Sequence, residues 1–153
     1  MVLRNFLIIL LIYMVGNVSG ADITLKNRHA EFVFDDSTRL VLKEIKNFQT
    51  GISISTDNTQ SDGLWKIFLT DSTCKEITLI PKSKPKCERI SPDGLRFTWR
   101  ETIETAQVIV TARVTLPEDS GVALWHLSVD VKGKPGIQVS SVIYPILNQV
   151  RSF

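Results

Sequence analysis

The chain has few residues of the types that build metal and catalytic sites. Only two cysteines, Cys74 and Cys87, and two histidines, His29 and His126, occur among its 153 residues. Two thiols with no histidine near them in the sequence do not complete the tetrahedral shell of a structural zinc site. The eight glycines form no phosphate-cradling loop. These shortages exclude the common metal and phosphate sites, and no cofactor is expected.

Net charge is scarce too, because the two signs nearly cancel. The sequence has 18 lysines and arginines against 16 acidic residues, a formal net charge of +2 at pH 7. A chain so close to neutral lacks the strongly basic character of a nucleic-acid-binding domain. Nucleic acid and anionic membranes are therefore not expected as partners.

Long hydrophobic runs are absent except at the N-terminus. A basic residue precedes an unbroken apolar run over residues 6–15, and small and polar residues follow it. This order is typical of a secretory signal peptide cut before Ala21, with Val18 and Gly20 at the two small-residue positions. The run is shorter than the ~20 residues that span a bilayer as a helix. The sequence therefore predicts a helical signal peptide over residues 1–20, secretion or periplasmic export, and no membrane span after cleavage.

The two cysteines are candidates for a disulfide. An exported chain meets an oxidising environment, in which two cysteines of one domain commonly pair. A bridge between Cys74 and Cys87 would stabilise the fold by about 3 kcal/mol through the loss of chain entropy in the unfolded state. The alternative is a pair of reduced thiols at neighbouring strand ends. The sequence favours the disulfide.

Alternation of apolar and polar residues dominates the chain after residue 22. It is clearest over residues 107–116 and 122–132, and residues 95–100 alternate as well. Such alternation is typical of antiparallel strands with one buried and one solvent-facing side. Weaker strand patterns occupy residues 23–25, 30–34, 40–46, 52–55, 64–69, 76–80, 87–90 and 137–143.

About ten or eleven short strands, joined by turns rich in Gly, Pro and Asx, predict an all-β fold. The pattern favours two large antiparallel sheets stacked as a β-sandwich. Residues 21–153 are expected to form this one domain. Neither a closing turn nor a polar tail follows the last strand pattern, so the domain is interpreted as incomplete at its C-terminus.

Three tryptophans are candidates for sugar contact, because the apolar faces of pyranose rings pack on indoles. Trp65, Trp99 and Trp125 all fall on the apolar side of the alternation, which is typical of core residues. Trp65 directly follows a polar loop, and it is therefore retained as a candidate for carbohydrate binding. A place in the core is the alternative for all three.

His126 lies on the polar side of its predicted strand, in a row with Ser128 and Asp130. Neighbours on one face of a strand are about 6.6–7 Å apart, too far for a hydrogen-bonded relay. The row is therefore interpreted as a polar sheet face, and His126 is retained only as a candidate for carbohydrate binding. His29 is interpreted as a surface residue. No catalytic residue is predicted for this chain.

A basic segment surrounds the cysteines. Between residues 75 and 89, five lysines and arginines outnumber two glutamates, and two prolines keep the segment extended. Binding of an acidic polysaccharide is one interpretation of this segment. The alternative is a solvated loop whose lysines protect a sheet edge.

Several short motifs occur in a familiar order. Residues 30–36 (AEFVFDD) are followed by 40–47 (LVLKEIKN), 49–51 (QTG) and, after a polar loop, 64–67 (LWKI). Residues 143–147 (IYPIL) come last. This order resembles the N-terminal β-supersandwich of secreted bacterial glycoside hydrolase-like proteins, whose fold is similar to galactose mutarotase.

The resemblance implies a role beside an enzyme. In such proteins the carboxylates that cleave the glycosidic bond lie in a following domain, so it implies a non-catalytic, carbohydrate-associated module. Its partners would be a polysaccharide or oligosaccharide and the missing catalytic domain of the same parent protein. His126 would stand in for the histidine of the mutarotase relatives, but it lacks a recognisable glutamate partner. The alternative is a free-standing secreted adhesion module that binds a glycan or a protein.

Overall fold

The computed structural model describes residues 22–36, 39–56, 62–133, 136–147 and 150–152. These residues form twelve β-strands and no helix, so none of them belongs to a helix that could cross a membrane. The predicted signal peptide lies outside the described residues. The prediction of an all-β, antiparallel fold is confirmed.

The strands form three antiparallel sheets. One sheet contains β1 (Ile23–Lys26), β2 (Ala30–Asp35), β3 (Val41–Asn47), β4 (Ser53–Thr56) and β12 (Val150–Ser152), in the order β1-β2-β3-β4-β12. A second contains β7 (Lys86–Ser91), β8 (Gly94–Ile103), β9 (Ala106–Thr115) and β10 (Leu124–Lys132), in the order β10-β9-β8-β7. The third contains β5 (Lys66–Thr70), β6 (Glu76–Leu79) and β11 (Gln138–Ile143), in the order β11-β5-β6.

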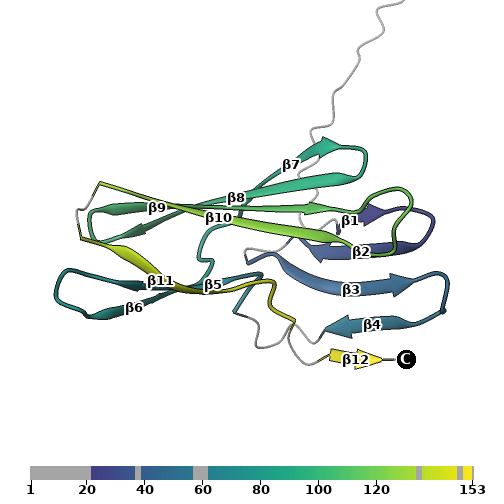
Figure 1. The fold of residues 1–153 in the computed structure, drawn as a ribbon, viewed down its shortest axis with the longest axis horizontal. Coiled ribbons are helices and arrows are strands. Elements are labelled where there is room, and N and C mark those ends of the chain that lie inside the picture. The colour runs from purple at the N-terminus through teal and green to yellow at the C-terminus, as the bar shows by residue number, and fades with distance from the viewer. Residues whose placement is uncertain (1–21, 37–38, 57–61, 134–135, 148–149, 153) are drawn as a thin grey trace, which may run out of the picture.

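The sheets are arranged in two layers (Figure 1). The four-stranded sheet forms the upper layer. The three-stranded and five-stranded sheets lie side by side and form the lower layer, although β1 and β2 rise to the level of β10 in this view. The sequence predicts two large sheets, but the lower layer is divided because β5 pairs with β6 and β11 and not with β4. The side of the four-stranded sheet that faces the lower layer is called its inner face, and the opposite side its outer face.

The core lies between the layers. Seven apolar inner-face residues of β8 and β9 are at most 2% exposed; they are Leu95, Phe97, Trp99, Val108, Val110, Ala112 and Val114. From the lower layer, the Phe34 ring lies 5.3 Å from Phe97, and the Trp65 ring makes an edge contact with Trp99 at 5.7 Å between centroids. Each large apolar side chain removed from water contributes about 1.5–3 kcal/mol. The long strand β8 therefore holds both lower sheets in place.

A buried amide also joins the two layers. Asn27, in the turn between β1 and β2, donates hydrogen bonds through Nδ2 to the carbonyls of Pro117 and Ser120 at 2.6 and 2.7 Å. Its Oδ1 accepts from the backbone N–H groups of His29 and Ala30 at 2.7 and 2.9 Å. The Asn27 side chain is buried, but both its amide nitrogen and its amide oxygen form hydrogen bonds, so neither polar atom is left unpaired.

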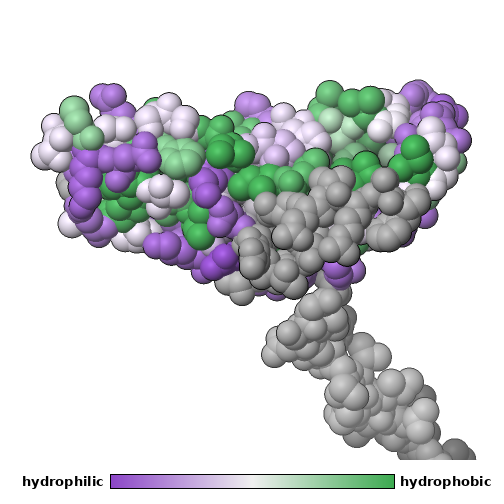
Figure 2. All heavy atoms as spheres, turned by 90° about the horizontal axis from the view of Figure 1, so that it is seen from below, coloured by the Kyte–Doolittle hydropathy of each residue, from purple (hydrophilic) through white to green (hydrophobic). Residues whose placement is uncertain are grey.

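The core is less covered along β10 and β11 than elsewhere. The inner-face residues of β10 are only half-buried, and all six residues of β11 are exposed. Val139 and Val142 are each 40% exposed although they pair with buried Leu69 and Ile67 of β5. Seen from below, the lower layer shows hydrophobic side chains at its surface among polar ones (Figure 2).

Candidate functional site

Trp65 lies in the core. Its side chain is 0% exposed and packs edge-on against Trp99, and its indole Nε1 has no hydrogen-bond partner among the described residues. Stacking on a sugar requires an exposed ring face. The structure thus corrects the carbohydrate-binding prediction for Trp65 and places this residue where the core alternative put it.

The predicted disulfide is absent from the structure, in which Cys74 and Cys87 are free thiols. Cys74 belongs to the turn between β5 and β6, whereas Cys87 lies in β7 of the other layer. That turn is at the end of the molecule away from β7 (Figure 1), which is why the short sequence separation does not bring the thiols together. Partial burial of its sulfur raises the pKa of Cys87, and the Asp36 carboxylate adds to the rise.

His126 is exposed on the outer face of β10, as its alternation predicts. The strand register places it opposite Arg113 of β9, which is itself opposite Arg96 of β8. Arg96 pairs in turn with Glu88 of β7. A polar row therefore crosses all four strands, in the order Glu88, Arg96, Arg113 and His126. Neither Ser128 nor any other described residue forms a hydrogen bond with the His126 ring.

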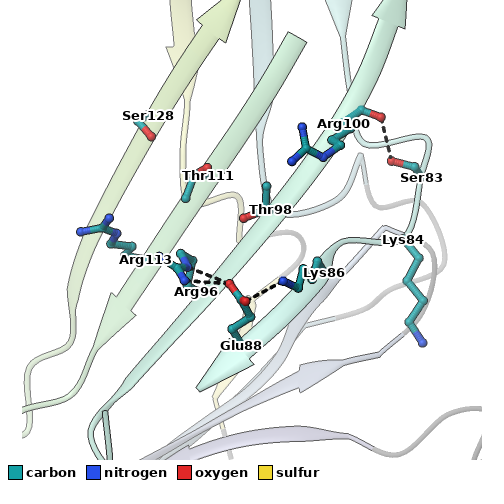
Figure 3. Close-up of a pocket in the computed structure, with 10 residues that line it drawn as sticks. All are labelled: Ser83, Lys84, Lys86, Glu88, Arg96, Thr98, Arg100, Thr111, Arg113 and Ser128. Atoms are coloured by element: carbon teal, nitrogen blue, oxygen red, sulfur yellow. Dashed lines mark hydrogen bonds and ion pairs between the residues drawn. The ribbon is translucent and has the colours of Figure 1, made fainter. Parts of the chain in front are cut away.

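A second row runs parallel to the first, two residues further along each strand. The register aligns Lys86, Thr98, Thr111 and Ser128 across β7, β8, β9 and β10. The three hydroxyl groups of this row lie next to one another on adjacent strands (Figure 3). Each hydroxyl can both donate and accept a hydrogen bond. This row therefore offers a line of adaptable hydrogen-bonding groups on a rigid sheet.

Together the rows form a shallow hollow of about 620 Å³ on the outer face. The residues that line it are Ser83, Lys84, Lys86, Glu88, Arg96, Thr98, Arg100, Thr111, Arg113 and Ser128. His126 lies beside Arg113 at the edge of this set. Figure 3 shows that the lining side chains come from all four strands and from the loop before β7.

Glu88 neutralises part of the positive charge in the hollow. Its Oε2 accepts from Arg96 Nε at 2.9 Å, and its Oε1 lies 2.7 Å from Lys86 Nζ. The hydrogen bonds from Lys86 and then Arg96 lower the pKa of Glu88 below its ordinary value. Glu88 thus stays ionised and holds these two cations in place.

Glu101 positions the loop at one end of the hollow. Its side chain is only 5% exposed, on the inner side of β8. Its Oε1 accepts hydrogen bonds from the backbone N–H groups of Lys82 and Ser83 at 3.0 and 3.1 Å, and from the Ser83 hydroxyl at 2.9 Å. A buried carboxylate with three donors is well compensated for the loss of water. Ser83 and Lys84 are thereby held at the rim.

The basic segment predicted from the sequence contributes only part of this site. Lys84 and Lys86 line the hollow, but Arg89 does not; its guanidinium donates to the carbonyls of Pro92 and Thr24. Sequence reasoning missed Arg96, Arg100 and Arg113, which occupy polar positions of two alternating strands. The alternation put them on the outer face, but only the register shows that they meet.

Comparison with protein-family models, curated proteins and solved structures finds no match to this chain. Within the described parts of the chain, no three histidine, cysteine or acidic side chains gather in a way that could hold a metal ion. The arrangement on the outer face can form ion pairs and hydrogen bonds with a ligand that lies on this face.

Proposed function

We propose that this chain is an exported, carbohydrate-associated β-sandwich module that contacts its glycan with the outer face of the four-stranded sheet. The observation that carries the proposal is the hydroxyl row Thr98, Thr111 and Ser128, flanked by cationic side chains in an open hollow. Sugars present many hydroxyl groups, and side chains that donate and accept are suited to them. The N-terminal sequence pattern supports export.

The resemblance to glycoside hydrolase-like proteins supports a further part of this proposal. The module lies beside a catalytic domain of the same parent protein and forms one wall of a glycan cleft. This chain itself supplies no catalytic residue. Sequencing the gene downstream of the codon for Phe153 tests this part. If the downstream DNA encodes no hydrolase domain, either in the same reading frame or after a frameshift, this part is contradicted.

A glycan array probed with the purified chain tests the binding function. We expect binding that weakens about fivefold when Thr111→Val removes one hydroxyl without changing the side-chain shape, because a neutral hydrogen bond contributes about 1 kcal/mol. Thr102→Val, on the same face of β8 but outside the hollow, is the matched control and leaves binding unchanged. The proposal fails if no glycan binds, or if the two variants behave alike.

A protein-binding adhesion module is the second candidate. It is favoured by β11, which among the described strands pairs only with β5 and exposes Val139 and Val142 on the side of the core. An exposed apolar strand at a sheet edge is a common place for another strand to pair. Under this alternative, Val139→Glu abolishes partner binding and leaves glycan binding intact. A protein whose only measurable ligand is a glycan argues against it.

A further inference from the structure

The charge of the hollow is strongly unbalanced, although that of the whole chain is not. The lining residues include five cationic side chains and one carboxylate, that of Glu88. The complete sequence carries a net charge of only +2. The positive excess is therefore concentrated on this face. Asp130, on the outer face of β10, lies outside the lining and is ion-paired with Lys132 at 3.2 Å.

Three of the five cations already have carboxylate partners. Lys84 pairs with Asp36 at 2.8 Å, and Lys86 and Arg96 share Glu88. The guanidinium groups of Arg100 and Arg113 form no ion pair or hydrogen bond with any residue that the structure describes. Both side chains are exposed. These two guanidinium groups can therefore bind a ligand without first breaking an ion pair within the protein.

The two available arginines lie on either side of the hydroxyl row. Arg100 aligns with Ile109, which is four residues from Arg113 on β9. With about 3.3 Å per residue and about 4.8 Å between strands, their backbone positions are about 14 Å apart. Thr98 and Thr111 lie between them, and Figure 3 shows both arginines on the same face as these hydroxyl groups. A chain of sugars laid across the hollow would therefore reach both guanidinium groups and the hydroxyls at once.

Among the residues that the structure describes, no aromatic side chain lines the hollow. Stacking contributes much of the affinity with which proteins hold single-stranded nucleic acid, and indole stacking serves neutral sugars in a similar way. A ligand on this face therefore gains affinity from ion pairs and hydrogen bonds alone. Guanidinium groups bind carboxylates and other oxyanions through paired N–H groups, which neutral hydroxyls do not match.

From these observations we infer that the glycan held by the outer face is anionic, a polymer whose sugars carry carboxylate or sulfate groups. The inference rests on the proposed function and specifies its ligand class. Arg100 and Arg113 bind the acidic groups, and the hydroxyl row binds the sugar ring between them. Glu88 restrains Arg96 and Lys86, so that these two cations contribute less.

Two matched pairs of polymers test the inference by isothermal titration calorimetry with the purified chain. Polygalacturonate is compared with its methyl ester, which has the same backbone without the charge, and dextran sulfate is compared with dextran. We expect the charged member of at least one pair to bind tenfold or more tightly than the neutral member, about what one or two charge-assisted contacts provide. The pair that shows the difference identifies carboxylate or sulfate as the group recognised.

Variants locate the effect. Replacing both available arginines (Arg100→Ala with Arg113→Ala) should weaken binding of the charged polymer about tenfold or more. The matched control, Arg28→Ala with Lys75→Ala, removes the same charge from exposed positions in turns of the lower layer and should change affinity less than twofold. Circular dichroism and thermal melting establish that both double variants fold like the unaltered chain.

The outcomes separate this inference from the proposed function. Equal binding of charged and neutral polymers overturns the inference and leaves the proposed function standing. Binding of no polymer overturns both. An equal loss of binding in the control variant also overturns the inference, because the chain then binds any polyanion through its overall charge. Tighter binding of single-stranded DNA than of any polysaccharide overturns it as well, because the ligand is then nucleic acid.

Discussion

The inner and outer faces of the four-stranded sheet consist of alternate residues of the same strands, yet they have opposite properties. On β8, Phe97 and Trp99 of the inner face are 0% exposed, whereas their neighbours Thr98 and Arg100 line the open hollow. One face stabilises the fold by burying apolar area. The other face carries hydroxyl groups and unpaired charge that contribute little to stability.

This difference separates the residues that determine the fold from those that determine recognition. Substitutions on the inner face should change the free energy of unfolding, and those in the hollow should change the affinity for a ligand.

Trp99→Ala is expected to cost about 3–5 kcal/mol of unfolding free energy, since it leaves a cavity against Trp65 and Phe97. Urea denaturation of the purified chain measures this cost. The matched control is Thr98→Ala, one residue away on the outer face, which should cost no more than about 0.5–1 kcal/mol. Similar costs for the two variants would show that β8 does not have a structural and a functional side.

Glu101→Ala is expected to cost about 1.5–3 kcal/mol, because it leaves the N–H groups of Lys82 and Ser83 without their acceptor. It should also weaken glycan binding, since Ser83 and Lys84 lose their position at the rim. Glu101→Gln keeps an acceptor oxygen and should be milder in both respects. Calorimetry and urea denaturation of both variants measure these two effects. An alanine variant as stable as the unaltered chain would contradict this role of Glu101.

Arg113→Ala is expected to change stability by less than about 0.5 kcal/mol, because its side chain is exposed and has no ion-pair or hydrogen-bond partner among the described residues. Its affinity for the charged polymer should fall severalfold. Arg113→Lys keeps the charge but not the fork of donors, so it should restore only part of the affinity. A destabilised Arg113→Ala protein would mean that the outer face is also structural.

Glu88→Gln is expected to give the smallest effect and the opposite sign, a modest gain in affinity for dextran sulfate. The substitution releases Lys86 and Arg96 from their shared carboxylate. Because the folded-state pKa of Glu88 is lowered, its ion pairs stabilise the fold above the ordinary glutamate pKa and are lost as pH falls through the lowered value. Sulfate groups stay ionised throughout, so the unaltered chain should bind dextran sulfate more tightly as Glu88 protonates. Calorimetric titrations with dextran sulfate at several pH values measure this gain. The Glu88→Gln variant should show a smaller gain than the unaltered chain, because it lacks the Glu88 carboxylate.

Strand positions could be predicted from the sequence because alternation is a local property. Each of the eleven predicted strand patterns corresponds to a strand, with bounds that shift by at most three residues, and the core positions of β8 and β9 were also predicted. The short strand β12 was missed, because Val150–Ser152 is too brief to show a period. Its backbone pairs with β4, a contact that no local pattern records.

The candidate site could be predicted only in part, because it depends on long-range register. His126 was placed correctly on a polar face, but its neighbours Arg113 and Arg96 come from other strands. Trp65 was a misleading candidate because it follows a loop directly, while its ring turns into the core. The expected disulfide failed for a related reason, since nearness in sequence did not reveal that Cys74, in the turn between β5 and β6, and Cys87, in β7, lie in different layers.

The most direct test of the central claim is a ¹H–¹⁵N NMR titration of the labelled chain with the charged polymer that binds best. We expect the largest amide shifts at Arg96, Thr98, Thr111, Arg113 and Ser128, on the outer face of β8, β9 and β10. Shifts confined to β11 and β5, with the outer face unchanged, would contradict it.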